Sequence, residues 1–317
     1  MPRPPDAEAL LLRLEWTVIR RLDGLLHGDY RSFFRGPGLD LADLREYQYH
    51  DDVRHIDWNV TARMQTPYVR EFNEDRDLTA WFLLDLSASL DFGTRVKKQA
   101  VAAEFVGVLA RLLTRHGNRV GAVAYGRDVD TIIPARSGRR HVLHILQALM
   151  ARPVVAPEPT RLADLLSQAS VIMPRRSLVF VVSDFISAPG WAPALARLAL
   201  RHEVIAVRLS DPLEHELPDL GMLLLQDAES GEQLFVDTHD KGFRRRFAAL
   251  AAERERSLRE DFANAGVDAL ELSTDSDLLD ALLSFAELRQ LRTRSACGGG
   301  LPRRVGATVG PAREVSA

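Results

Sequence analysis

The chain has 317 residues, 46% of them hydrophobic, which is enough to bury a sizeable core in one large or two ordinary domains. Its 41 basic and 44 acidic residues give a net charge of −3, so it has no overall electrostatic field for nucleic acid or anionic lipid. The single cysteine, Cys297, excludes an internal disulfide framework and a cysteine-based zinc site, as is typical of a reducing compartment. Site chemistry must therefore use oxygen or imidazole groups.

The N-terminal stretch 1–28 mixes apolar residues with charged ones. Arg13, Glu15 and Arg20 interrupt any secretory core, so this stretch predicts an amphipathic helix rather than a signal peptide. No apolar run approaches the roughly 18 residues that a membrane span requires. We therefore expect a soluble, cytoplasmic protein without a membrane span.

The next segment, about residues 30–77, lacks a sustained 3.6-residue period and mixes aromatic with charged residues. This composition predicts extended, loop-rich structure that packs on a neighbouring domain, with its charges paired in a network. His50 and His55 are candidate metal ligands, but two histidines without a matching third ligand are more often surface or hydrogen-bonded residues.

From residue 78 the pattern alternates between apolar strands and amphipathic helices. Strands are expected at 78–85, 118–126, 129–135, 177–184 and 203–211, and helices at 95–117, 139–150, 160–172 and 191–201. Near-continuous apolar strands between amphipathic helices indicate a mostly parallel sheet covered on both faces. The predicted fold class is therefore α/β, with a doubly wound, mostly parallel sheet of Rossmann type.

The C-terminal third adds further elements. The sequence predicts a hairpin at 221–237 with its turn at 229–231, a charged helix at 240–264, a strand at 267–273 and a last helix at 276–292. The tail, 293–317, is rich in Gly, Pro and Arg and predicts disorder. The expected organisation is an N-terminal helix and segment (1–77) packed on a main domain (78–292), followed by this tail.

Oxygen-bearing side chains stand at the ends of two expected strands and at one expected loop-to-helix junction. Asp85, Ser87 and Ser89 leave the first strand, Thr160 stands at a loop-to-helix junction, and Asp184 leaves an apolar strand. Ligands of parallel α/β sheets bind beyond the carboxyl ends of the strands, and hard oxygen ligands suit Mg²⁺ or Mn²⁺. Alternatively, Ser87 and Ser89 are helix N-caps and Asp85 is an ordinary strand-end residue. An Asp-x-Ser-x-Ser pattern by itself is weak evidence for a metal site, because it arises by chance in about one chain in ten of this size.

The stretch DLSAS, with the later threonine and aspartate, resembles the metal-ion-dependent adhesion site of von Willebrand factor A domains over about residues 78–292. The resemblance implies that the hydroxyls of Ser87 and Ser89 contact a cation and that Asp85 lies at the base of the site. It also implies that Thr160 binds the cation directly or through water, and that Asp184 acts through water. The threonine loop, EPTRL, lacks the glycines that often precede this threonine in the family.

The upstream stretch GPGLDLADLREYQYHDDVRHIDWNVTARMQTPYVREF is similar to the signature of the bacterial family DUF58. The shared elements are Arg-x-Tyr, Asp-Asp-Val-Arg-x-Ile-Asp-Trp and Ala-Arg. Members of this family are typically encoded beside MoxR-type AAA+ ATPases, so the resemblance implies such a partner. Some members also carry membrane helices and an extra β-domain, and we expect neither in this chain.

Three functions remain open at this point. The first is a non-enzymatic, divalent-metal-dependent protein–protein interaction module, an adaptor or co-chaperone that captures an acidic side chain of its partner. The second is a metal-dependent phosphoester hydrolase that uses Asp85; Ser87 stands where haloacid dehalogenase-type enzymes have a second aspartate, and no lysine or histidine is clearly placed to assist. The third, nucleic-acid binding through the basic runs at 95–98, 136–141 or 243–247, is less favoured because such runs are usually solvated helix faces.

Overall fold

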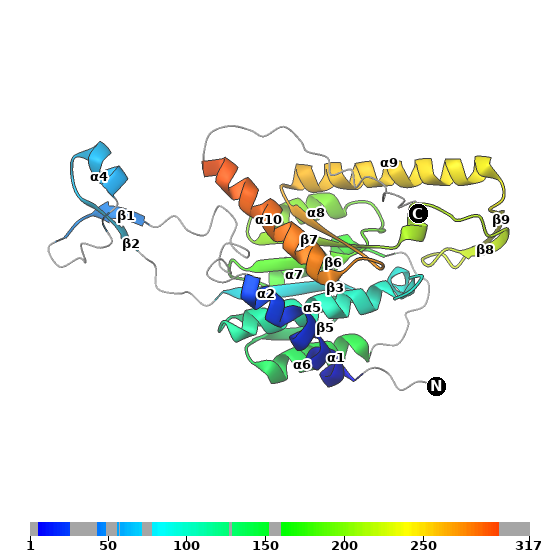
Figure 1. Ribbon diagram of the computed structural model, residues 1–317, viewed down its shortest axis with the longest axis horizontal. Helices are drawn as coiled ribbons and strands as arrows, with labels where there is room; N and C mark the ends of the chain where they lie inside the picture. Colours follow the sequence, from blue (N-terminus) through cyan, green and yellow to red (C-terminus); the bar gives the residue numbers. More distant parts are fainter. Residues whose placement is uncertain are drawn as a thin grey trace, which may run out of the picture.

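The structure is a computed structural model that describes residues 6–25, 43–48, 56, 58–71, 78–126, 129–151 and 160–297. Its centre is a six-stranded sheet with the strand order β10-β7-β6-β3-β4-β5 (Figure 1). The strands are β3 (Thr79–Asp85), β4 (Arg119–Tyr125), β5 (Val129–Arg136), β6 (Leu178–Ser183), β7 (Glu203–Ser210) and β10 (Asp268–Ser273). The main helices are α5 (Lys98–Arg115), α6 (Arg139–Met150), α7 (Leu162–Ile172), α8 (Trp191–Ala199), α9 (Lys241–Ala265) and α10 (Leu278–Cys297).

The chain starts this sheet at its centre and builds outward in both directions. It runs from β3 to β4 and β5, then crosses back to β6 on the other side of β3 and continues to β7 and β10. All neighbouring strands pair in parallel except β5, which runs antiparallel to β4. The reversal beside β3 is the point where α/β sheets of this kind open a crevice. The predicted α/β fold class with a doubly wound, mostly parallel sheet is confirmed.

Side chains of β3 alternate between two cores, one on each face of the sheet. Phe82 and Leu84 belong to the core that α5 and α6 cover, whereas Trp81 and Leu83 belong to the core under α7 and α8. Phe82 is fully buried and stacks on Phe180 of β6 with ring centroids 5.1 Å apart. Both faces of the strand are thus apolar, which explains its near-continuous hydrophobic sequence.

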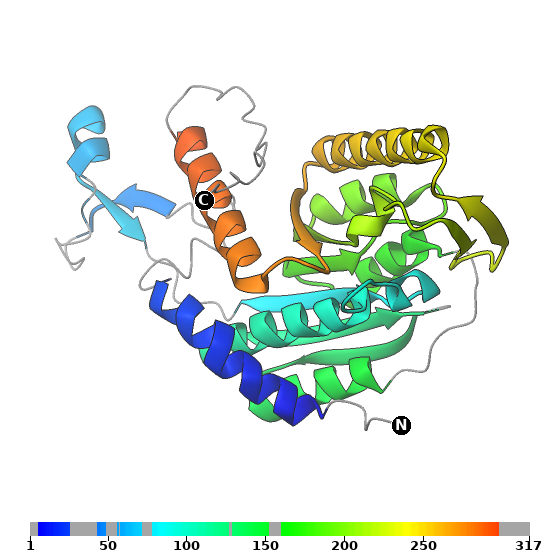
Figure 2. The same ribbon diagram turned by 45° about the vertical axis from the view of Figure 1, so that its right-hand side comes forward.

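The N-terminal residues form a helical rod that completes the first core. It consists of α1 (Ala7–Leu14), a π-helical turn η1 (Glu15–Ile19) and α2 (Arg20–Leu25), and it lies across α5 and α6 in Figure 2. Leu11 and Ile19 are fully buried in the α5 core, and Glu15 accepts from Arg111 Nε at 2.5 Å. The expected amphipathic helix is therefore present. Among the described residues, no helix has both the length and the apolar composition to cross a membrane.

The described part of the signature segment forms a small unit of its own. Strands β1 (Asp43–Glu46) and β2 (Tyr68–Glu71) pair antiparallel, and a helix, α4 (Trp58–Met64), lies between them in sequence. The prediction of extended, loop-rich structure is wrong for residues 58–64, which form α4. A helix of seven residues is too short to show a clear 3.6-residue period in the sequence. Figures 1 and 2 draw the unit apart from the large sheet. The residues that connect this unit to the large sheet lie outside the described residues, so its expected packing on the main domain stays a prediction. His50 and His55 also lie outside the described residues.

The C-terminal elements follow the expected order with one changed boundary. Strands β8 (Met222–Gln226) and β9 (Gln233–Asp237) form a separate antiparallel hairpin, as predicted. Helix α10 continues to Cys297 instead of ending near 292, because the residues after 292 include no Gly or Pro that would stop a helix before Gly298. The tail prediction for 298–317 lies outside the described residues.

Candidate functional site

Buried polar side chains gather where the parallel strands end. Asp85 ends β3, Asp184 follows β6, Asp211 follows β7 and Thr274 follows β10, and each is at most 7% exposed. Parallel strands place their carboxyl ends at the same edge, so residues far apart in sequence meet there. The structure thus brings predicted residues together with several that the sequence did not single out.

Asp85 is held by hydrogen bonds to both of its carboxyl oxygens. Ser87 N donates to Oδ1 at 3.0 Å and Ser183 Oγ donates to Oδ2 at 2.6 Å. Burial raises the pKa of Asp85 to about 6, the charge of Asp184 adds to this rise, and the hydrogen bonds partly offset it. A fully buried carboxyl with both oxygens engaged orients the loop after β3, and this arrangement does not favour Asp85 as a nucleophile on a phosphoester.

The hydroxyls of Ser87 and Ser89 lie next to each other. Their Oγ atoms are 3.1 Å apart, and both residues are 5% exposed. Ser87 stands at the N-cap of the short 3-10 helix η3 (Ala88–Asp91), but its side chain makes no capping hydrogen bond, which weakens the N-cap interpretation. Two neighbouring oxygens of an octahedral Mg²⁺ at its usual bond length are about 3 Å apart. The observed spacing therefore fits two ligands of one cation.

Thr160 contributes a buried hydroxyl that has no hydrogen-bond partner within the described ranges. Thr160 is 2% exposed. Its carbonyl oxygen accepts from Ser187 Oγ at 2.8 Å and from Ala188 N at 2.9 Å, which ties it to the loop after β6. Unpaired buried hydroxyls are rare in proteins, and they often indicate a missing ion or water.

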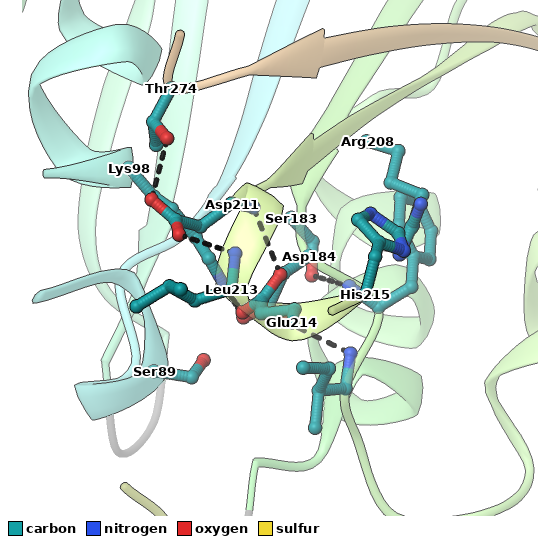
Figure 3. Close-up of polar contacts among 12 residues, drawn as sticks. Ser89, Lys98, Ser183, Asp184, Arg208, Asp211, Leu213, Glu214, His215 and Thr274 are labelled. Carbon is teal, nitrogen blue, oxygen red and sulfur yellow. Dashed lines mark hydrogen bonds and ion pairs between the residues drawn. The ribbon is translucent and has the colours of Figure 1, made fainter. Parts of the chain in front are cut away.

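Asp184 is engaged by a lysine that the sequence analysis did not place. Lys98 Nζ donates to Asp184 Oδ2 at 2.9 Å and also pairs with Glu214 of the short 3-10 helix η4 (Pro212–Glu214) (Figure 3). Burial would lower the pKa of Lys98, but the charges of Asp184 and Glu214 outweigh it, so this pKa is raised. The expectation that the basic run 95–98 is a solvated helix face is wrong for Lys98, which is 1% exposed. Lys98 is the first residue of α5, the helix that follows DLSAS, and this position could have indicated that Lys98 lies near the site.

The backbone after Asp184 adopts a strained conformation. Phe185 has φ 57°, which is unusual for a bulky residue, and its side chain packs against Trp191 and Phe262. Ile186 N donates to Asp184 Oδ1 at 3.0 Å. The buried aromatic cluster thus holds a turn that keeps the Asp184 carboxylate at the sheet edge.

Asp211 forms a second node that ties the loops of the sheet edge together. Its carboxylate accepts from Thr94 N at 2.9 Å, Thr94 Oγ1 at 3.0 Å, Leu213 N at 3.0 Å and Thr274 Oγ1 at 2.6 Å. Burial alone would raise the pKa of Asp211, but these hydrogen bonds lower it below its ordinary value. Figure 3 shows this node beside Lys98 and Glu214. Asp211 therefore braces the site and is not free to bind a ligand.

The donor set fits a hard cation through hydroxyl oxygens. Ser87, Ser89 and Thr160 offer neutral oxygens, Asp85 supports them from below, and Lys98 holds Asp184, which suits contact through water rather than direct binding. Within the part of the chain that the structure describes, no cluster of three or more His, Cys, Asp or Glu side chains has the geometry of a metal site. A cation here would depend on the hydroxyls.

Comparisons with known proteins cover most of the chain. The family described as "Protein of unknown function DUF58" matches residues 43–257. The uncharacterized protein Rv1480 of Mycobacterium tuberculosis is similar, with 38% identity over 289 residues, 90% of each chain. The solved structure of BatB from Bacteroides thetaiotaomicron has a TM-score of 0.44 at 14% identity, over 69% of this chain and 99% of that one. The solved structure of the SpRpn10 VWA domain has a TM-score of 0.37 at 12% identity, over 72% of this chain and 100% of that one.

Proposed function

The chain belongs to the DUF58 family, and on this basis we propose that it is a non-enzymatic protein–protein interaction module that depends on Mg²⁺ or Mn²⁺. Its proposed role is that of an adaptor or co-chaperone of a MoxR-type AAA+ ATPase in the cytoplasm. The observation that carries the proposal is the buried, unpartnered hydroxyl of Thr160 at the edge where the Ser87 and Ser89 hydroxyls meet.

The charges of the site support capture of an acidic group. When bound, a divalent cation supplies a coordination position for a carboxylate oxygen of a partner. Neutral hydroxyls from Ser87, Ser89 and Thr160 leave most of the cation's charge for that partner. Lys98 holds Asp184 in an ion pair, which keeps a second charged ligand from neutralising the cation. Affinity for the partner is therefore expected to depend on the metal.

A capture assay tests the proposal. Immobilised full-length protein is incubated with a MoxR-type ATPase from the same organism, in Mg²⁺ or in chelator. We expect capture in Mg²⁺, and a loss of about tenfold or more in chelator, in Asp85→Ala and in the double variant Ser87→Ala/Ser89→Ala, in the range typical of damaged metal sites.

Asp91→Ala is the matched control, because Asp91 lies on the same segment and pairs with the exposed Lys97. This control should retain capture, and circular dichroism should show that all variants are folded. Capture that survives both chelator and the serine substitutions would refute the proposal.

A further inference from the structure

A groove of about 970 Å³ opens beside the last strand of the large sheet. The loop that contains η4 forms one wall, the first turns of α10 form the other, and the end of β10 lies between them. β10 is the outermost strand of the sheet, and Figure 2 shows α9 and α10 diverging from it. No predicted site residue lines this groove, so it is a surface of its own.

The charge of the groove comes from acidic side chains. Its lining includes no lysine or arginine, and the Nδ1 atom of its one histidine, His215, lies 3.9 Å from Glu255 Oε1. The carboxylates that line it are those of Glu216, Glu271, Asp277 and Asp280. A surface hollow with this excess of negative charge favours a cationic ligand.

Two of these carboxylates are engaged within the protein and two are not. Asp277 Oδ1 accepts from a backbone N–H in the first turn of α10 at 2.7 Å, and Glu271 pairs with the exposed Arg259 of α9 at 3.5 Å. Within the described ranges, the side chains of Glu216 and Asp280 make no hydrogen bond or ion pair. These two carboxylates are therefore available to a cation from outside.

The inner surface of the groove combines a buried hydroxyl with apolar side chains. Ser210 is 7% exposed, and its hydroxyl forms no hydrogen bond with any described residue. Ser210 is paired in register with Ser273 at the ends of β7 and β10, so the two side chains lie on the same face of the sheet. Leu213 and Leu217 add apolar surface. Buried polar groups without a partner are rare, so the Ser210 hydroxyl is a second sign of a ligand here.

We infer that this groove binds a basic segment of a partner protein, with arginine side chains that pair with Glu216 and Asp280. The methylene stem of an arginine packs on apolar surface such as that of Leu213 and Leu217, while its guanidinium donates to carboxylate and hydroxyl oxygens. A bare metal ion fits less well, because in the described part of the chain no three acidic or histidine side chains converge as metal ligands do. The volume also lies at the upper end of the range of about 300–1,000 Å³ for small-molecule sites.

The groove and the candidate site share η4. Glu214 of η4 pairs with Lys98, which also holds Asp184, whereas Pro212 and Leu213 of the same turn line the groove. A segment seated in the groove therefore lies next to the edge where capture of an acidic group is proposed. The inference goes beyond the proposed function, because binding in the groove needs no cation.

Fluorescence anisotropy tests the inference on the full chain. The probe is a short fluorescein-labelled peptide of alternating arginine and alanine, and the control peptide has neutral citrulline in place of arginine. We expect the wild type to bind the arginine peptide at physiological salt, with the same affinity in Mg²⁺ and in chelator. Glu216→Gln/Asp280→Asn should weaken this binding about fivefold or more, since two exposed ion pairs are lost. Ser284→Arg, which places a cation in the lining, should weaken it as well.

Glu232→Gln/Glu260→Gln is the matched control, because it removes the same charge from two exposed positions outside the groove. It should bind the peptide as the wild type does, and circular dichroism should show that every variant is folded. Equal affinity of the wild type and Glu216→Gln/Asp280→Asn for the arginine peptide would overturn the inference, as would equal binding of the citrulline peptide. Binding of spermine in place of the peptide, lost in the same variant, would also overturn it, because the groove would then hold a small polyamine.

Discussion

Asp85 links the stability of the metal-free protein to pH. Its pKa in the folded protein is about 6, above its ordinary value of 3.8, mainly because the carboxyl is buried. Between these two values the folded state holds a proton that the unfolded state has released, so the free energy of unfolding falls as pH rises. The loss amounts to about 3 kcal/mol, is absent below pH 4 and is complete above pH 6.

Asp85→Asn should remove this pH dependence, because asparagine has the same shape and does not titrate. In chelator, we expect the variant to lose about 3 kcal/mol less than the wild type between pH 4 and pH 7. Denaturant unfolding followed by tryptophan fluorescence measures the difference. Asp91→Asn, a substitution on the same segment outside the site, should retain the wild-type profile, and an Asp85→Asn profile that matches the wild type would contradict this assignment.

At the scale of single residues, the sequence identified the polar groups at the strand ends but not what holds them. The interaction of Lys98 with Asp184 spans 86 positions, and that of Ser183 with Asp85 spans 98. Neither pairing leaves a local pattern, since each arises only when the sheet assembles.

At the scale of elements, close packing between neighbouring strands makes a specific glycine necessary. Gly121 lies in β4 opposite Trp81 of β3, and a Cβ atom there would come within 2.7 Å of the indole ring. Both residues are buried, so the ring has little space to move. The strand therefore requires glycine despite its poor strand propensity.

Gly121→Ala should destabilise the protein by about 1–3 kcal/mol, the usual range for overpacking a core. Gly107→Ala in α5 is the contrasting variant: its Cβ would lie 3.1 Å from a flexible Leu14 methyl group, and alanine improves helix propensity by about 1 kcal/mol. We expect it to be close to neutral. Urea unfolding compares the two, and equal midpoints would show that the contact with Trp81 is not limiting.

At the scale of the whole molecule, the sequence predicted the fold because each main element carries a strong local pattern. Apolar runs such as 178–183 and amphipathic helices such as α6 were located within a few residues. The short helix α4 and the end of α10 were missed, since neither is marked by a period or a breaking residue. The N-terminal rod was predicted as a helix, but its place in the central core became evident only from the packing.

The charge distribution of the whole molecule is nearly balanced, so recognition must come from a local site. The carboxylates of Asp184 and Glu214 are both paired with the ammonium of Lys98 at the sheet edge. A divalent cation on the neutral hydroxyls of Ser87, Ser89 and Thr160 keeps most of its charge, and this charge attracts an acidic partner.

A crystal structure of the full chain in Mn²⁺, with anomalous data, tests the central claim most directly. The account predicts one strong anomalous peak in contact with the hydroxyls of Ser87 and Ser89, with Thr160 and Asp184 directly or through water around it and Asp85 beneath. A crystal saturated with Mn²⁺ that shows no anomalous peak among these five residues would contradict the account.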